Sequence, residues 1–345
     1  MSEIAKTFLQ QSKSCGKLGS PFMERLMRLC GERLTPGGAV ADHIFGWQGD
    51  PSPNADSVPL RLAGALHMLK RGGNRILGAV YPPLAPDDDA FWAAIVSVLE
   101  TEADQIIALM ASPPQTNEVR RSVAIIPALH VLAAKVGLPI HLSEVGASAG
   151  LNLRADQFRL HAGPTIYGPD EAQVVLTPDW DGPAPAPAPL TVVARDGVDL
   201  NPLDPARDAA RLFGYLWPDQ ADRIARTEAA IATAAAHPAT LARGDAVDWL
   251  ESALAPVPGC LRVLFHTIAW QYLSPEGQRA GDEAIAKAGA AATDAAPLAR
   301  VAMEADGRSA ALNVQLWPGG ARTHLAQVDY HGRWITWMQT QLTQR

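Results

Sequence analysis

Residues 139–154 read PIHLSEVGASAGLNLR, and this stretch decides the fold class. An apolar run leads into the acid Glu144, and a turn of glycine and other small residues follows before a helical pattern begins. A strand, a glycine turn and a helix start together let the backbone approach a small ligand closely. Both a nucleotide-type cofactor site and the nucleophile elbow of a hydrolase use such a turn, so other features must separate the two.

The composition indicates a globular protein that acts on a small partner. The chain has 345 residues, of which 48% are hydrophobic, and 29 basic against 36 acidic residues give a formal net charge of -7. No long run of Lys or Arg supplies the positive surface of a nucleic-acid-binding protein. No segment approaches the roughly 18 apolar residues of a membrane helix. We therefore expect a small-molecule substrate and no membrane partner. The charge disfavours nucleic acid as a partner, but the sequence leaves a peptide or RNA acceptor open and does not predict an oligomeric state.

The three cysteines bear on compartment and on metal binding. Cys15, Cys30 and Cys260 are an odd number without metal-type spacing, so we expect buried free thiols and no metal site. The first residues of the chain carry no secretory signal pattern. Reduced thiols and a missing export signal predict a cytoplasmic protein.

The hydrophobic pattern predicts two regions. Residues 1–137 have helical spacing and are expected to form a helical N-terminal region. In residues 138–345 short apolar runs alternate with helical segments, which predicts an α/β domain with a Rossmann-like, doubly wound and mostly parallel sheet. A hairpin and a Pro-Ala loop are expected as an insertion at about residues 160–190. The expected strands are Ile140–Val145, Thr191–Val193, Leu261–Phe265 and Leu298–Met303, with closing strands within 323–337.

The turn after the first strand favours a cofactor site. Its pattern, Glu144-x-Gly146-x-x-x-Gly150, resembles the turn of class I S-adenosylmethionine-dependent methyltransferases. It departs from the G-x-G-x-x-G of dinucleotide folds, because Ser148 stands in place of the second glycine. Acids also follow later predicted strands, and open α/β sheets bind ligands at the carboxyl ends of their strands. One spacing departs from a compact unit: 53 positions separate Gly146 from Asp199, against about 20 in a nucleotide-binding unit.

The methyltransferase resemblance implies a role for each of these residues. Glu144 and the turn are expected to hold the amino-acid end of S-adenosylmethionine, Asp199 the ribose, and Asp245 with Ala246 the adenine. We expect Gly146→Val to abolish cofactor binding while the protein stays folded. The expected cofactor-binding residues are Glu144, Gly146, Ala147, Ser148, Gly150, Asp199, Asp245 and Ala246.

Longer motifs resemble one particular family. QTNEVRR at residues 115–121 and EVGASAGLNL at residues 144–153 are similar to motifs of the bacterial domain-of-unknown-function family 2332. The resemblance covers nearly the whole chain and implies a bacterial cytoplasmic protein with a Rossmann-like methyltransferase core. It implies no activity. The shorter matches are Arg195-x-Gly197-x-Asp199-x-x-Pro202, Trp217-Pro218 with Arg223, Gly244-Asp245, and Phe265-His266 with Tyr272-Leu273.

Two segments are expected around the methyl acceptor. Residues 115–121 hold Gln, Asn, Glu and two Arg, which exceeds the polar capacity that a helix cap needs, and an arginine there suits a carboxylate. His266 follows the predicted fourth strand, where a general base or an orienting group would lie. The expected catalytic residues are His266, Tyr272 and Glu118, and the expected substrate-binding residues are Thr116, Asn117, Arg120 and Gln271.

Two other functions stay open at this point. The turn also reads G-x-S-x-G, so Ser148 is a candidate hydrolase nucleophile. Against a hydrolase, a long helical region precedes the first strand, and an elbow gives no reason for an acid before the turn. A non-catalytic binding or regulatory protein is the second alternative, because a fold does not imply a chemistry. The candidate hydrolase partners of Ser148 are Asp245 with His266, or Asp329 with His331.

Overall fold

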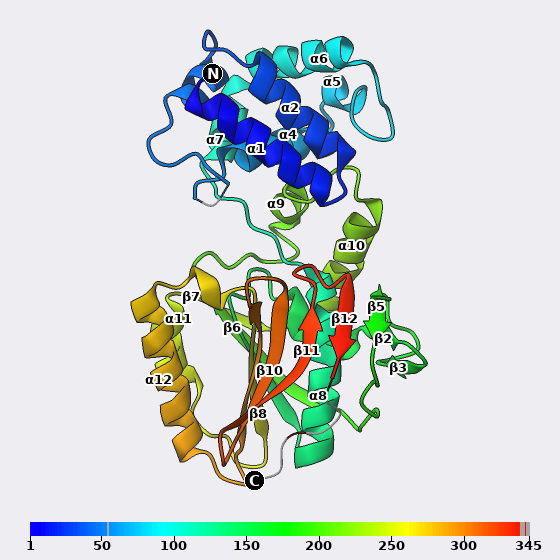
Figure 1. The fold of residues 1–345 in the computed structure, drawn as a ribbon, viewed down its shortest axis with the longest axis vertical. Coiled ribbons are helices and arrows are strands. Elements are labelled where there is room, and N and C mark those ends of the chain that lie inside the picture. The colour runs from blue at the N-terminus through cyan, green and yellow to red at the C-terminus, as the bar shows by residue number, and fades with distance from the viewer. Residues whose placement is uncertain (54, 339–341, 343–345) are drawn as a thin grey trace. The chain divides into compact units, whose positions relative to one another are not determined.

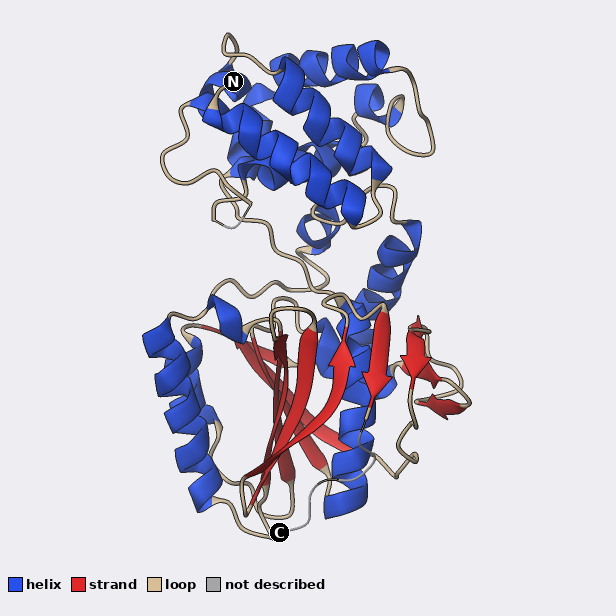
Figure 2. Ribbon diagram, viewed as in Figure 1, coloured by secondary structure: helices blue, strands red, loops and turns tan. Residues whose placement is uncertain are grey.

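The computed structural model describes residues 1–53, 55–338 and 342. They form two compact units, the first from Met1–Thr116 with Asp208–Ala225 and the second from Asn117–Arg207 with Arg226–Arg345. Figure 2 shows helices throughout the first unit, whereas the strands (red) belong to the second. The boundary lies at residue 116 and not at the expected 137, because the helix before the first strand packs on the sheet.

The helical unit has a hydrophobic core of its own, to which Phe8 and Leu62 belong. Ser20 sets the start of α2: its hydroxyl accepts a hydrogen bond from the Met23 N–H and donates one to Asp219. Within the described ranges, no helix is both long and apolar enough to cross a bilayer. The helices are α1 (Glu3–Lys17), α2 (Pro21–Arg33), α3 (Ala39–Phe45), α4 (Val58–Arg71), α5 (Arg75–Gly78), α6 (Asp88–Thr101), α7 (Ala103–Met110) and α9 (Ala209–Gly214).

A buried histidine lies in this core. His67 on α4 is 3% exposed, and its ring stacks on that of Tyr81 with the centroids 6.3 Å apart. Among the described residues neither His67 Nδ1 nor the Tyr81 hydroxyl has a hydrogen-bond partner. Burial, aided by the positive charge of Arg71, lowers the pKa of His67 from 6.5 to about 4. The folded unit therefore holds a neutral imidazole down to mildly acid pH.

The α/β unit is built on a nine-stranded sheet with the order β5-β12-β11-β10-β9-β8-β1-β6-β7. Parallel pairing runs from β7 through β6, β1 and β8 to β9, and an antiparallel meander continues from β9 to β12. The predicted mostly parallel sheet is confirmed. The main strands are β1 (Ile140–Val145), β6 (Val192–Asp199), β7 (Thr240–Arg243), β8 (Leu261–Thr267), β9 (Leu298–Ala305), β10 (Ala310–Trp317), β11 (Ala321–Val328) and β12 (Trp334–Trp337).

Helices cover both faces of the sheet, with α8 on one side and α11 and α12 on the other (Figure 1). Val145 and Leu264 point toward α11 and α12, since they share a buried cluster with Leu250 and Ile285 of those helices. Side chains alternate along a strand, so Glu144 points to the opposite face, that of α8. The helices, with η for 3₁₀ turns, are η1 (Val119–Arg121), α8 (Ser122–Val136), η2 (Leu151–Gln157), α10 (Ala221–Ala236), α11 (Ala246–Ala253), η3 (Trp270–Tyr272) and α12 (Pro275–Ala291).

The order of the strands reverses beside β1. After β1 the chain forms β6 and β7 on one side, and then returns to form β8 and β9 on the other. Open α/β sheets bind ligands outside the carboxyl ends of their strands at such a reversal. The turns after β1, β6, β7 and β8 lie at this edge. β11 is antiparallel to β10 and hence parallel to β9, so the turn after β11 lies there as well.

The long connection between β1 and β6 holds the expected insertion. It begins with η2 and forms a small sheet of order β3-β2-β4, after which β5 pairs with β12 at the edge of the main sheet. The hairpin turns at Gly163, whose φ of 60° suits glycine. These strands are β2 (Arg159–Ala162), β3 (Thr165–Tyr167), β4 (Val175–Leu176) and β5 (Asp179–Asp181).

The protein is expected to lose stability as the pH falls from 6.5 toward 4, because His67 binds a proton in the unfolded chain before it does so in the folded one. The full difference corresponds to about 3 kcal/mol of unfolding free energy. Denaturant unfolding across this pH range should show a shallower loss for His67→Gln than for the unchanged protein. Equal losses, or an imidazole carbon shift that titrates near pH 6.5 in the folded protein, would contradict a buried neutral His67.

Candidate functional site

The turn after β1 has a backbone that suits glycine and small residues. Gly146, Ser148 and Gly150 have φ values of 71°, 53° and 64°, all in the left-handed region. A Cβ added to Gly146 would lie 2.7 Å from Cβ of Ala269, in the turn after β8. The two turns beside the strand reversal are therefore in close contact. Gly146→Val would strain this packing as well as any ligand site, so the expectation of a folded valine variant has no support here.

Side chains from two other segments hold this turn in place. The Ser148 N–H donates to Asp199 Oδ2 at 2.8 Å, at the end of β6. The Leu151 N–H donates to Asn117 Oδ1, also at 2.8 Å. The N–H groups of Gly146 and Ala147 both donate to the Val198 carbonyl at 3.0 Å. The predicted cofactor residues of β1 and β6 are thus brought together with the 115–121 segment.

A 3₁₀ helix, η2, follows the turn in place of the α-helical pattern expected from the sequence. The Leu151 N–H at its start bonds to a side chain, and Arg154 lies with a φ of -105° inside it. Arg154 is buried and donates to the carbonyls of Gly150 at 2.5 Å and His237 at 2.7 Å. Side-chain bonds therefore satisfy backbone groups here that a regular helix would pair internally.

Glu144 is a buried acid with a free oxygen. Its side chain is 2% exposed, and within the described chain neither Glu144 Oε2 nor Ser148 Oγ, in the turn that follows, has a hydrogen-bond partner. Burial raises the pKa of Glu144 well above its usual 4.5, and the charge of Asp199 raises it further, whereas Arg154 and Arg121 lower it. Unpartnered buried polar atoms are costly and call for a partner. A ligand that brings a cation or hydrogen-bond donors fits this pair of atoms.

The turn after β11 lies at the same edge of the sheet and contacts the 117–121 segment. Arg121 donates from Nη1 to the Thr267 carbonyl, at the end of β8, and from Nε to the Tyr330 carbonyl, both at 3.0 Å. His331 Nδ1 lies 3.9 Å from Glu118 Oε2. Gly332 has a φ of 70°, and a side chain there would collide with the Arg120 carbonyl. The 117–121 segment is thus clamped between the turns after β1, β8 and β11.

His266 lies on the other face of the sheet from Glu144. Glu144 pairs in register with Phe265, so the next residue of β8, His266, points toward α12. It is fully buried and bonds to Glu304 Oε1 at 2.6 Å, and its ring stacks on Trp270. These residues line a cavity of about 300 Å³ on that face. The structure does not bring His266 together with the cofactor turn.

The other predicted site residues lie in varied positions. Tyr272 is 79% exposed and, like Gln271, lies at the surface of η3. Thr116 is exposed at the end of the helical unit. Asp245 caps α11, with Oδ1 accepting from Val247 N–H at 2.7 Å, and Ala246 begins that helix. His266, Tyr272 and Glu118 therefore do not form the expected catalytic cluster. Of these three residues, Glu118 lies beside the turn after β1.

No base is placed for Ser148 as a nucleophile. Its hydroxyl oxygen has no hydrogen-bond partner in the described part of the chain, whereas a hydrolase triad needs a histidine bonded to it. Asp329 bonds to Arg333 at 2.8 Å and serves the turn instead of orienting a catalytic imidazole. Among the described residues, no group of three or more His, Cys, Asp or Glu side chains could hold a metal ion.

Two residues of this edge, Arg121 and His331, were not among the site residues expected for a methyltransferase. Arg121, and not the neighbouring Arg120, makes the bonds that join β8 to the turn after β11. The two arginines are adjacent in η1, so their side chains point in different directions. His331 could have been found only with the strand order in hand, because its place at this edge depends on β10.

Replacing Glu144 by glutamine is expected to stabilise the ligand-free protein by roughly 1–3 kcal/mol at neutral pH, because the variant buries no carboxylate. The folded-state pKa of Glu144 is raised. The protonated side chain therefore contributes its full stability to the folded protein below pH 4.5, and this stability is lost as the pH rises through the folded-state pKa. The gain from Glu144→Gln should therefore grow with pH in thermal or denaturant unfolding. A gain that is absent at pH 8, or a variant less stable at every pH, would contradict an unpaired buried acid.

Comparisons with known proteins assign a family. No curated protein and no solved structure matches the chain. A family profile described as "Uncharacterized protein conserved in bacteria (DUF2332)" matches residues 5–337, which include both units and all the segments of the candidate site. The chain therefore belongs to this bacterial family of uncharacterised proteins.

Proposed function

We propose that the protein is an S-adenosylmethionine-dependent methyltransferase that acts on a small-molecule acceptor. The observation that carries the proposal is the free, buried oxygen of Glu144 at the end of β1, beside a left-handed small-residue turn at the strand reversal. An ammonium group is a fitting partner for such an oxygen, because it supplies both charge and hydrogen bonds. The Ser148 hydroxyl, which also has no partner within the described chain, is a second candidate to bond the cofactor from this turn.

The residues at this edge fit the parts of the cofactor. Glu144 would bind the amino group of its methionine end, and the small residues of the turn would let the backbone approach it. Asp199 accepts the N–H groups of Ser148 and Asn201 at the end of β6, beside the turn after β1, and a carboxylate there would suit the ribose hydroxyls. Asp245 and Ala246, after β7, remain the predicted contacts for adenine. When bound, S-adenosylmethionine supplies a methyl group on a positively charged sulfur.

The acceptor is proposed to bind between the turns after β8 and β11. Glu118 and His331 lie there, with His331 Nδ1 3.9 Å from Glu118 Oε2. An imidazole held beside a carboxylate can take up the proton that an O–H or N–H acceptor loses as it is methylated. Correct placement of the acceptor would supply the larger part of the rate. Asn117 and Arg120 contribute to the wall of this space through the 117–121 segment.

Calorimetric titration with S-adenosylmethionine and S-adenosylhomocysteine tests the cofactor assignment. We expect saturable one-site binding of both, with NAD(P) giving none. Glu144→Gln should lose at least about tenfold in affinity, since a charge-assisted hydrogen bond is removed. Because this variant is expected to be more stable than the unchanged protein, unfolding would not explain the loss. Failure of both cofactor forms to bind would refute the proposal.

Ser148→Ala separates a methyltransferase from a serine hydrolase. The variant should retain most of the affinity for S-adenosylhomocysteine, because the Ser148 N–H bond to Asp199 is made by the backbone. Ester hydrolysis by the unchanged protein that disappears in Ser148→Ala would favour a hydrolase instead.

Turnover separates an enzyme from a binding protein on the same fold. Methyl-labelled S-adenosylmethionine is incubated with a bacterial small-molecule extract, and transfer of label is compared between the unchanged protein and His331→Gln. We expect labelled product with the former and about 10²-fold less with the latter, the scale of a general base. Binding of the cofactor should be equal in the two. Bound cofactor with no transfer to any extract would favour the regulatory alternative.

A further inference from the structure

We propose that Glu304, on the face of the sheet opposite Glu144, is a positioning residue. It fixes the turn after β8 where that turn contacts the turn after β1, the proposed cofactor turn. This inference rests on the proposed function. Glu304 touches no part of the proposed ligand site, and it acts through the backbone of residues 268–270. His266, which was expected to be catalytic, belongs to the same positioning cluster.

One oxygen of Glu304 accepts hydrogen bonds from three donors. Oε1 accepts from the backbone N–H groups of Ala269 at 3.1 Å and Trp270 at 3.2 Å, and it lies 2.6 Å from His266 Nδ1. An oxygen that accepts three hydrogen bonds is well served by a full negative charge. Burial lowers the pKa of His266. Burial acts to raise the pKa of Glu304, but the interactions with His266 and with the two amides outweigh it and lower that pKa. A neutral histidine therefore donates to an ionised acid.

The turn that Glu304 holds is strained. Ile268 has a φ of 50°, which is rare for a β-branched residue. Such a conformation persists only where its surroundings fix it. The Ile268 N–H bonds to the Met303 carbonyl at 2.8 Å, and Glu304 fixes the two residues that follow. Bonds from β9 thus hold the whole turn after β8.

The held turn borders the proposed ligand site. Ala269 is the residue that a side chain at Gly146 would strike, so its position sets the packing behind the cofactor turn. The Thr267 carbonyl accepts from Arg121, which connects the same turn to the wall near the acceptor. A shift of residues 267–270 would therefore move both parts of the site.

A second layer of bonds keeps the cluster in one arrangement. Arg300 donates from Nε to His266 Nε2 at 3.0 Å, which leaves the histidine proton on Nδ1, toward Glu304. Arg300 also bonds to Asp282 at 2.7 Å, and its guanidinium lies over the Trp270 ring. A buried ion pair alone adds little stability, and apolar residues often replace such groups without loss. This cluster also bonds to the backbone of the turn after β8, so its role is to position that turn as well as to stabilise the fold.

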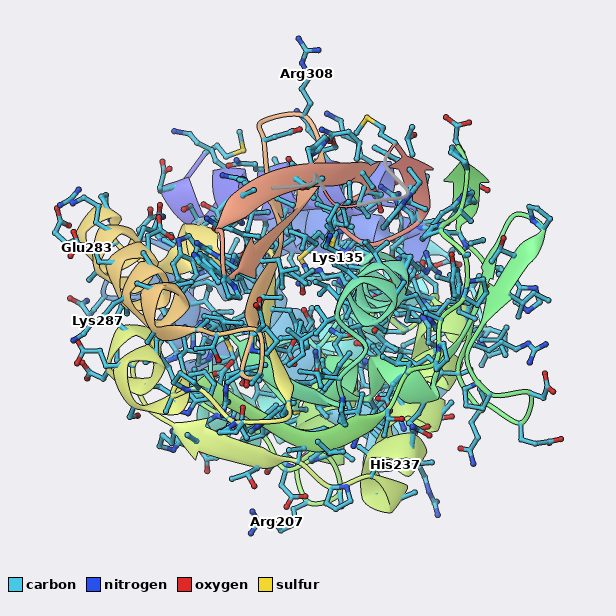
Figure 3. The ribbon with its side chains drawn as sticks, turned by 90° about the horizontal axis from the view of Figure 1, so that it is seen from below. Lys135, Arg207, His237, Glu283, Lys287 and Arg308 are labelled. Atoms are coloured by element: carbon cyan, nitrogen blue, oxygen red, sulfur yellow. The ribbon has the colours of Figure 1, made fainter. Side chains whose placement is uncertain are left out.

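The test compares Glu304→Gln with Glu283→Gln, a matched change on the outer side of α12, where Figure 3 shows Glu283 away from the sheet. Amide hydrogen exchange is measured first, in protein without added ligand. The neutral amide of Glu304→Gln should raise the exchange rates of the Ala269 and Trp270 N–H groups by roughly tenfold, while Glu283→Gln leaves them unchanged. Glu304→Met, which removes the acceptor altogether, should raise them further.

Affinity for S-adenosylhomocysteine is measured next on the same proteins. Glu304→Gln should bind roughly tenfold more weakly than Glu283→Gln, although no atom of Glu304 reaches the ligand site. His266→Phe keeps the ring stack on Trp270 but loses the bond to Glu304, and it should weaken binding in the same direction. Unchanged exchange at Ala269 and Trp270 overturns the inference whether or not any cofactor binds. Faster exchange with unchanged affinity overturns the link to the ligand site.

Discussion

A carboxyl group without a partner, that of Glu144, sits where the strand order of the sheet reverses, and the surrounding site is arranged around it. Isolating a carboxylate from water raises its free energy, so the folded protein holds this acid in a costly state. A site that sacrifices stability in this way commonly does so for binding, because a ligand that completes the missing bonds recovers the loss. Asp199, Asn117 and Arg154 fix the backbone of the turn beside the acid, and in the proposed function this turn keeps its shape when a ligand binds.

The two faces of the sheet have different roles in the proposed site. On the α8 side, Glu144 offers its free oxygen at the carboxyl edge of β1. On the α12 side, Glu304 holds the turn after β8 through the backbone amides of Ala269 and Trp270, and His266 bonds to Glu304. The parity of β8 explains the division, since Phe265 and His266 are neighbours in sequence and point to opposite faces.

The sequence predicted the parts of this protein that local pattern determines. The strand before the turn, the turn itself and the parallel order of β1, β6 and β8 follow from apolar runs and glycine spacing. The position of His266 on the far face did not follow, because which residue of a buried strand faces the site depends on register, and an apolar run carries no alternation. His331 was not predicted at this edge for a related reason: the direction of β11 depends on β10, which was not among the expected strands.

Gly332 carries no side chain, yet the packing of the turn after β11 on the 117–121 segment depends on it. Its backbone lies against the Arg120 carbonyl, so any substitution would push the turn after β11 away from the 117–121 segment. Position 332 is therefore open to very few evolutionary changes, although it is far in sequence from every motif that identifies the chain. A survey of natural variation in this family should find it as restricted as the turn after β1, for a reason that is purely steric.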